Sequence, residues 1–194
     1  MPRKKVFDEG EVLDAAMRVF WTEGWHGATV PALRAATGLS SSSLYNAFGD
    51  KAGLYHEAMD RYGAVFGARL RESLEDPDIR IALTGFFDRF LDQLEDPQIP
   101  PGCMTAQACF DLGGNDAPQV DDARAALERP RAALEARIAK AVEDGALRKG
   151  TDAAALADLY VVLLRGAAAT HRATGDTRWA RNAFRQVMDQ LPIP

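Results

Sequence analysis

Apolar residues recur along most of the chain at intervals of three and four residues, the spacing that lines one face of an α-helix. Runs in which apolar and polar residues alternate, which would indicate half-buried strands, are nearly absent, as are Asn-Gly hairpin turns. No unit of about 20–50 residues repeats. The pattern therefore predicts an all-α protein of about nine helices.

Three short helices are predicted within the first fifty residues, at 9–23, 30–37 and 41–48. Asp8 can cap the first of them, and Glu11 completes a capping-box pattern three residues later. Gly24 is expected to end that helix. The turn between the second and third helices contains Gly38, as is typical of helix-turn-helix units.

The remaining helices are predicted to be longer, beginning with one that starts near Lys51 and ends before Pro77. The others are expected at residues 79–94, 103–112, 118–144, 152–172 and 177–190. Pro130 falls inside the fourth of these six and is expected to kink or split it. The penultimate helix is apolar over Leu156–Ala169, which is more than one buried face needs.

The third short helix carries the chemistry expected at a DNA surface. About eight residues long, it spans roughly 12 Å, close to the width of the major groove of B-DNA. Leu44 and Phe48 lie four residues apart and should face inward, so the residues that face outward are small or polar: Ser41, Ser42, Ser43, Tyr45 and Asn46. Asparagine can pair with adenine through two hydrogen bonds. Lys51 would reach a phosphate at the start of the next helix. Serine-rich turns and Tyr-Asn pairs are also common on ordinary surfaces, so composition alone leaves DNA binding open.

The N-terminal segment resembles the DNA-binding domain of the TetR family of transcriptional regulators. The resemblance covers about residues 8–55 without a gap. It rests on Ala15-Ala16, Phe20, Gly24-Trp25-His26-Gly27-Ala28-Thr29-Val30, Ala35-Ala36-Thr37-Gly38-Leu39-Ser40 and Ser43-Leu44-Tyr45-Asn46-Ala47-Phe48-Gly49-Asp50-Lys51.

That resemblance implies a homodimeric regulator, most often a repressor, that binds a palindromic double-stranded DNA operator and is released by a small-molecule ligand. It implies a helix-turn-helix domain over residues 1–51 and a helical ligand-binding and dimerisation domain over residues 52–194, dimerised through its last two helices. By position, the implied DNA contacts are Thr29, Ser41, Ser42, Tyr45, Asn46 and Lys51. Ser41 departs from the family, since many relatives carry Lys or Arg there.

Net charge adds weak support for this division. The chain as a whole carries −5, which argues against nucleic acid at first. Residues 1–51 hold six basic and six acidic residues, so the whole deficit lies in residues 52–194. The basic residues Arg3, Lys4 and Lys5 lie near the start of the chain.

The C-terminal segment offers candidates for a sensing site. An apolar ligand pocket could be lined by Phe66, Phe86, Phe87, Phe90, Met104 and Phe110, together with Cys103, although each aromatic could equally be core. Cys103 follows Pro100-Pro101-Gly102 and opens a predicted helix, where the helix dipole and free N–H groups would stabilise a thiolate. Some branches of the TetR family carry Gly-Cys at this helix start, and certain of those respond to oxidants or electrophiles. Cys103 is thus predicted as a redox sensor, with a buried structural cysteine as the alternative, whereas Cys109 is expected to be core.

Other functions find little support in the sequence. The three histidines are scattered, and no metalloprotease, zinc-binding, phosphate-loop or serine-hydrolase motif occurs, so no enzyme activity, metal or cofactor is expected. No apolar run approaching the length of a membrane span, no secretory signal and no disulfide framework are recognised, which indicates a cytoplasmic protein without a membrane partner. The remaining alternative is a DNA-architectural helix-turn-helix protein without a ligand.

Overall fold

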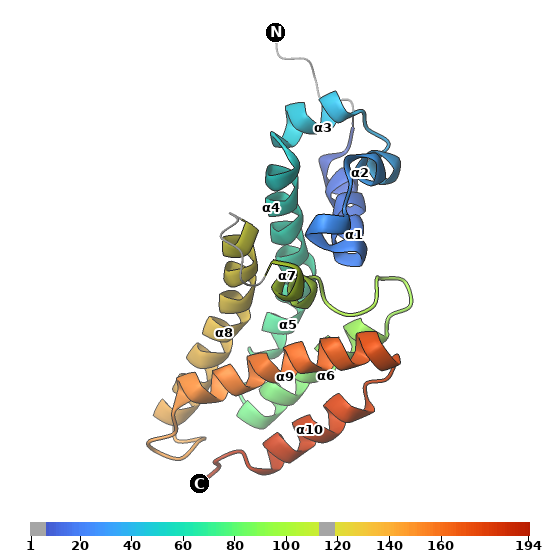
Figure 1. Ribbon diagram of the computed structural model, residues 1–194. Coiled ribbons are helices and arrows are strands. Elements are labelled where there is room, and N and C mark those ends of the chain that lie inside the picture. Colours follow the sequence, from blue (N-terminus) through green and yellow to red (C-terminus); the bar gives the residue numbers. More distant parts are fainter. Residues whose placement is uncertain (1–6, 113–118) are drawn as a thin grey trace.

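The computed structural model describes residues 7–112 and 119–194, in which every regular element is helical. The basic residues Arg3, Lys4 and Lys5 lie outside the described residues. The helices are α1 (Glu9–Gly27), α2 (Val30–Thr37), α3 (Ser41–Phe48), α4 (Lys51–Tyr62), a π-helical turn (Gly63–Gly67), α5 (Ala68–Ser73), α6 (Ile79–Glu95), α7 (Met104–Leu112), α8 (Gln119–Glu143), α9 (Ala153–Thr174) and α10 (Arg178–Asp189). Helices α1–α3 form one end of the molecule, and α9 and α10 lie side by side at the other (Figure 1). The predicted all-α class is confirmed.

Local capping explains why the N-terminal helices begin where the sequence predicts. The Asp8 carboxylate accepts a hydrogen bond from the Glu11 backbone N–H at 3.1 Å. The Ser40 hydroxyl accepts one from the Ser43 N–H at 3.1 Å, and the Asp50 carboxylate accepts one from the Gly53 N–H at 2.9 Å. These caps fix the starts of α1, α3 and α4, so α3 and the helix that follows it are held by adjacent residues.

Gly24 breaks α1, as expected, although one further turn follows it. Its backbone lies at φ 70° and ψ −178°, which interrupts the helix before Gly27. This positive φ disfavours any residue with a side chain, and a Cβ there would lie 2.8 Å from the Asp111 carboxylate oxygen of α7. The broken turn is therefore a point where α7 approaches the N-terminal helices closely.

Helices α4 and α5 form the single long helix that the sequence predicts, joined through the π-helical turn Gly63–Gly67. Counted this way, the described residues contain nine helices. Such π-turns inside α-helices often occur at functional sites. Here the turn follows Tyr62 and contains Phe66, and both residues line the cavity described below.

The expected split at Pro130 is wrong, because α8 runs as one helix from Gln119 to Glu143. Proline removes one backbone hydrogen bond, but the neighbouring Arg131 makes ion pairs that hold this part of the helix. Arg131 donates to Asp158 of α9 at 2.6 Å and to Glu135, one turn further along α8, at 2.9 Å. These ion pairs tie the proline-containing turn to α9.

The buried residues form one cluster that extends from Val12 to Leu191. Trp21 joins the N-terminal helices to the rest, with its ring meeting Tyr62 edge-on at 5.0 Å and Phe66 at 5.3 Å between centroids. Because the packing is continuous, a displacement of α4 must disturb α1. The domain boundary after residue 51 stays a prediction.

Helix α9 is buried on one face only. Tyr160 and Leu164 are fully buried within the chain, whereas Leu159 is 41% and Val162 67% exposed. The small residues of this helix differ in their surroundings. Ala167 and Ala168 are buried within this chain, whereas a Cβ on Gly166 would meet open space. Contrary to the sequence reading, α9 is long and apolar enough to cross a membrane by length and composition, and 28% of its apolar window is buried here.

Candidate functional site

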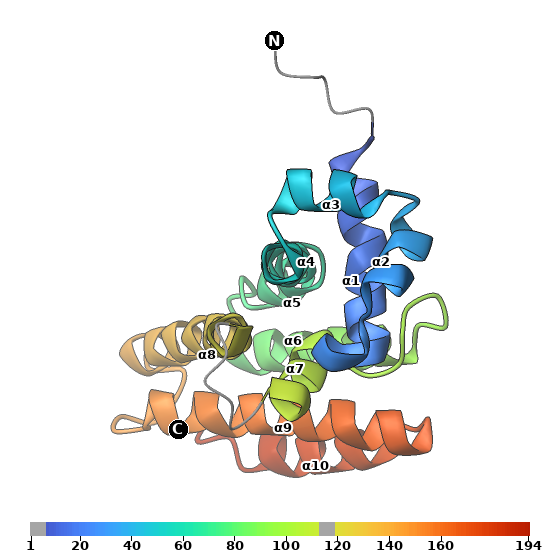
Figure 2. The same cartoon turned by 45° about the horizontal axis from the view of Figure 1, so that its top comes forward.

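The predicted DNA-contact residues gather on the outer side of α2 and α3. Ser42, Tyr45 and Asn46 are exposed, Ser41 and Ser43 are half-buried, and Thr29 is exposed at the start of α2. Leu44 and Phe48 face inward and are buried, as the helical spacing predicts. Figure 2 shows α3 at the end of the molecule far from α9 and α10. The structure thus leaves six of the seven predicted residues exposed or half-buried at the ends and outer side of α2 and α3.

Three of these hydroxyls already have partners. Thr29 caps α2 by accepting the Ala32 N–H at 3.3 Å. Ser42 and Ser43 lie 2.9 Å and 3.0 Å from the Ser40 hydroxyl, respectively. Tyr45 and Asn46 have no such partner among the described residues, so their polar groups are the ones presented to solvent.

Lys51 is the seventh predicted residue, and its ammonium group points into the protein. The nitrogen donates to the Trp25 carbonyl oxygen at 2.5 Å and lies 4.4 Å from the centroid of the Trp25 ring. Burial lowers the pKa of Lys51, and the negative charge of Asp111 opposes that shift. In this structure Lys51 ties the start of α4 to the end of α1.

Cys103 is buried immediately before α7, and its carbonyl accepts the first backbone hydrogen bond of that helix from Gln107 at 2.9 Å. Its sulfur accepts a hydrogen bond from the Tyr62 hydroxyl at 3.2 Å and one from Arg165 Nη1 at 3.0 Å. Gln93 Nε2 in turn donates to the Tyr62 oxygen at 2.9 Å. Side chains of α4, α6 and α9 therefore converge on one thiol at the start of α7.

The two cysteines differ in electrostatics. Burial alone would raise the pKa of the Cys103 thiol, but the Arg165 charge, the Tyr62 hydroxyl and the first N–H groups of α7 hold that pKa below its ordinary value. The pKa of Cys109 is raised, mainly by burial. The arrangement therefore favours thiolate at Cys103 and thiol at Cys109.

A cavity of about 50 Å³ lies beside this thiol. Four of the predicted pocket residues line it, namely Phe66, Phe86, Phe90 and Cys103, together with Tyr62 and Arg165. Three others do not. Met104 is buried in the core, and Phe87 stacks on Phe184 at 4.0 Å between ring centroids.

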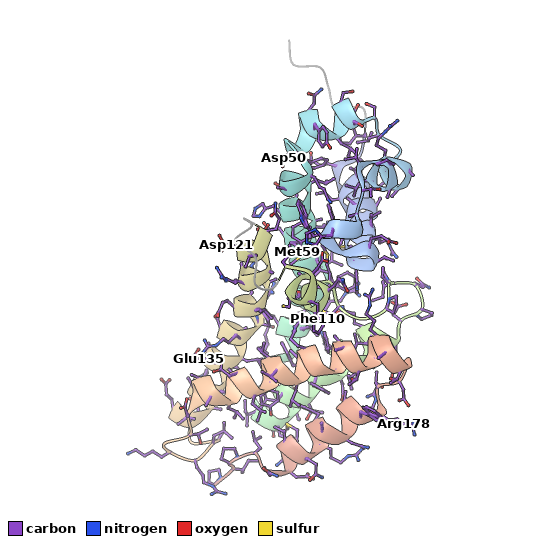
Figure 3. All side chains as sticks on the ribbon, viewed as in Figure 1. Asp50, Met59, Phe110, Asp121, Glu135 and Arg178 are labelled. Carbon is purple, nitrogen blue, oxygen red and sulfur yellow. The ribbon has the colours of Figure 1, made fainter. Side chains whose placement is uncertain are left out.

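Phe110 is the third, and its expected place in the pocket is wrong. Its side chain is 73% exposed, on the outer surface of α7 (Figure 3). Cys103 and Phe110 lie at opposite ends of α7, and helical periodicity in a nine-residue helix of mostly apolar and small residues does not decide which side faces the core.

Three residues of this site were not predicted from the sequence: Tyr62, Gln93 and Arg165. Arg165 did leave a signal, because it is the one basic residue within the apolar stretch Leu156–Ala169. A single basic residue inside a largely apolar helix points to a specific partner. That partner could not be named from sequence, since Cys103 is 62 residues away along the chain.

Helix α7 also contacts the N-terminal helices directly. One Asp111 carboxylate oxygen accepts the His26 backbone N–H at 3.2 Å, in the turn after Gly24. Figures 1 and 2 both show α7 between α1 and α9. A change at Cys103 therefore has a short route to the end of α1.

Comparison with known proteins assigns both halves of the chain to one family. Residues 12–58 match the family described as bacterial regulatory proteins, tetR family, and residues 81–187 match the tetracyclin repressor-like C-terminal domain. The HTH-type transcriptional repressor ComR of Escherichia coli (strain K12) is 33% identical over 112 residues, which are 57% of this chain and 53% of ComR. The regulator YezE of Bacillus subtilis (strain 168) is 30% identical over 57% of this chain and 58% of YezE. The matches thus span only about half the length of these relatives.

Solved structures are similar over almost the whole chain. A cysteine variant of the TetR family regulator CifR, complexed with 26-bp double-strand operator DNA, is 27% identical with a TM-score of 0.89, covering 99% of this chain and 100% of that one. The reduced form of E. coli NemR is 17% identical with a TM-score of 0.84 over 95% and 96%, and it supports the fold alone. The C-terminal match alone covers more than half of the sequence. The chain belongs to the TetR family of bacterial transcriptional regulators.

Proposed function

We propose that the chain forms a cytoplasmic homodimer that represses transcription by binding a palindromic operator, and that it leaves the operator when a reagent modifies the Cys103 thiol. The observation that carries this proposal is the convergence of Tyr62 and Arg165 on the Cys103 sulfur. Tyr62 lies on the helix that begins directly after the recognition helix, and Arg165 lies on the helix whose outer face is uncovered. One thiol therefore contacts α4, which adjoins the helix that would bind DNA, and α9, which would dimerise.

The operator-binding surface is the outer side of α3. Asn46 is exposed and can read adenine, while Tyr45 and Ser42 can reach phosphates or base edges. The DNA-bound CifR structure, similar over the whole chain, supports this assignment. We expect Asn46→Ala to relax base preference by about 1–3 kcal/mol.

Dimerisation would use the uncovered apolar side of α9 and α10. Leu159, Val162 and Trp179 are 41%, 67% and 64% exposed, which is unusual for large apolar side chains. A second copy would cover them and give the two-fold symmetry that a palindrome requires, with half-sites about 34–36 Å apart.

The size of the cavity favours a small reagent. A volume of about 50 Å³ admits a molecule of a few non-hydrogen atoms, because one water occupies about 30 Å³ of liquid. Drug-sized ligands fill roughly 300–1,000 Å³ and would require rearrangement. A disulfide with Cys109 is excluded while α7 is intact, since six residues of helix rise by about 9 Å and bridged Cα atoms lie within about 7 Å. The expected products are a covalent adduct or a sulfenic acid.

Two contacts would transmit the modification of Cys103 to the DNA-binding helices. Modification at the sulfur displaces Tyr62 and with it α4. Because α3 directly precedes α4 in the chain, α3 would move with it. The start of α7 also shifts, and Asp111 at its other end holds the turn after Gly24 in α1. Both routes change the position of α3 relative to its copy in the dimer.

Gel-shift titration with DNA from upstream of its own gene tests the proposal. The unmodified protein should bind one fragment much more tightly than unrelated DNA. Treatment with peroxide or a quinone should release the wild type and the Cys109→Ser variant, whereas Cys103→Ser should stay bound. Equal affinity for all sequences would indicate an architectural protein, and normal release of Cys103→Ser would overturn the sensing role.

A further inference from the structure

The Arg165 guanidinium has no carboxylate partner in the described part of the chain. Its Nη1 donates to the Cys103 sulfur at 3.0 Å, and its Cζ lies 5.8 Å from the centroid of the Phe90 ring. Its Nε is buried and makes no hydrogen bond to any described residue. Arg129, which lines the same cavity, is instead paired with a carboxylate: its Nη2 lies 2.6 Å from Asp60 Oδ1.

Arg165 as a whole is half-buried, and a partly desolvated cation is stabilised by a counter-charge. Removing one member of a buried ion pair costs several kcal/mol in typical proteins, because the remaining charge is desolvated without compensation. Here the group that faces the guanidinium is the Cys103 sulfur, at hydrogen-bonding distance and at the start of a helix. The Cys103 sulfur is therefore the group placed to act as the counter-ion of Arg165, and this contact joins α7 to α9.

Building on the proposed sensing role of Cys103, we propose that the switch responds to loss of the negative charge on this sulfur. The inducers are then small electrophiles that convert the thiolate into a neutral thioether and leave Arg165 without its counter-ion. Reagents that leave a negative charge in the same place keep the Arg165 pair and do not release DNA.

The chemistry that distinguishes the two cases is simple alkylation. The thiolate electron pair forms an S–C bond to the electrophilic carbon, and the leaving group departs with the electrons of the broken bond. With iodoacetamide the C–I bond breaks, iodide leaves, and the product is a neutral carboxamidomethyl thioether. With iodoacetate the same bonds form and break, but the product carries a carboxylate of nearly the same size and shape.

A neutral adduct changes the contacts of two helices together. Tyr62 loses a charged acceptor for its hydroxyl, and Arg165 must turn toward water to be solvated, which displaces α9 or opens the cavity. A carboxymethyl adduct places carboxylate oxygens beside the guanidinium, which is the stronger pairing for arginine. The two adducts therefore differ in charge while sharing their bulk.

The test uses the full-length Cys109→Ser protein, alkylated at Cys103 to completion as verified by mass spectrometry. We expect the carboxamidomethyl protein to bind the operator at least about tenfold more weakly than the unmodified protein, which corresponds to about 1.4 kcal/mol. The carboxymethyl protein should stay within about threefold of the unmodified protein. Equal release by both adducts would overturn the charge inference and leave the sensing role intact. If neither adduct releases DNA, both the charge inference and the sensing role are overturned. Operator binding of the unmodified protein is measured in the same titration.

Arg165→Met provides the second arm, since methionine fills similar space without charge. In this variant the two adducts should no longer differ in the expected direction, because no guanidinium remains to distinguish them. Cys103 in Arg165→Met should also label more slowly than in the wild type at neutral pH and equally fast at high pH, where the thiol is fully ionised. A persistent preference for the neutral adduct, or an unchanged labelling profile, would show that Arg165 is not the counter-ion.

Discussion

The Lys51 ammonium nitrogen lies 2.5 Å from the Trp25 carbonyl oxygen and 4.4 Å from the centroid of the Trp25 ring. The sequence suggests a phosphate contact for Lys51, whereas in this structure its ammonium group makes these contacts within the chain. The lysine joins the first residue of α4 to the last turn of α1, on the side where Asp111 of α7 also acts. Its role in this structure is to hold the N-terminal helices in register with α4.

Lys51→Ala should therefore reduce stability more than it changes the electrostatics of DNA binding. We expect a loss of about 1–2 kcal/mol in the free energy of unfolding, from one charge-assisted hydrogen bond and one cation–π contact. Arg34→Ala is the matched control, as it removes an exposed basic residue from α2. Thermal unfolding and gel shifts at several salt concentrations measure both effects. A flatter salt dependence with unchanged stability would restore the phosphate role.

The parts of the fold that sequence predicts well are those fixed by neighbouring residues. Helices α2 and α3 begin and end at the predicted residues because Thr29, Ser40, Gly38 and Gly49 determine their caps locally. The position of Cys103 at a helix start follows in the same way from Pro100-Pro101-Gly102. Each of these inferences needs only a few consecutive residues.

The site itself depends on contacts that sequence does not specify. Tyr62 and Arg165 meet Cys103 across 41 and 62 residues, through helix packing that no local pattern encodes. Phe110 fails for a related reason, and the inward contact of Lys51 was not predicted for the same reason, since the direction of each side chain is set by tertiary neighbours rather than by residue type. Pro130 is tolerated because Arg131 finds a partner on α9.

A histidine–carboxylate pair should make the packing of α4 on α8 sensitive to pH. His56 Nδ1 lies 2.6 Å from the Asp122 carboxylate, whose hydrogen bond raises the pKa of His56, and Asp60 lies 3.6 Å from Nε2. The folded-state pKa of His56 is thus above its unfolded value of about 6.5. The pair contributes its full stability below that pH and loses it as pH rises through the folded-state pKa.

His56→Gln should consequently be less stable than the wild type near pH 6 and equal to it above the folded-state pKa. The difference should stay below about 1 kcal/mol, because the His56 side chain is largely exposed. His26→Gln is the control, since the His26 side chain is exposed without a carboxylate partner among the described residues. Denaturant unfolding across this pH range measures the effect, and a constant difference at all pH values would contradict it.

The uncovered face of α9 should fail as an interface when a charge is placed on it. Val162→Arg puts a cation on a side chain that is 67% exposed in the single chain, so the fold of the subunit should survive while the dimer dissociates. Ala167 is a poor site for this test, being 3% exposed within its own chain. Ala35→Arg on α2 is the exposed control. Light scattering should give a monomer for Val162→Arg and a dimer for the control. A wild-type protein that is monomeric in solution would contradict the proposed interface.

The contact between α7 and α1 should transmit the state of Cys103 to the N-terminal helices. Asp111 accepts the His26 N–H at 3.2 Å, and its carboxylate fills the space left by the missing side chain of Gly24. Asp111→Ala should remove this acceptor and cost about 1 kcal/mol of stability. Before alkylation the Asp111→Ala protein keeps its other contacts, so we expect it still to bind the operator. Its release from DNA on Cys103 alkylation should become weaker.

Asp111→Asn separates that transmission from general damage, since the amide retains an oxygen that can accept the same N–H. It should release DNA on alkylation as the wild type does, whereas Asp111→Ala should need more reagent or release only in part. Both variants lose the negative charge near Lys51, so a difference between them isolates the hydrogen bond. The measurement is operator affinity before and after stoichiometric alkylation. Full release of Asp111→Ala would place the transmission in α4 alone, through Tyr62.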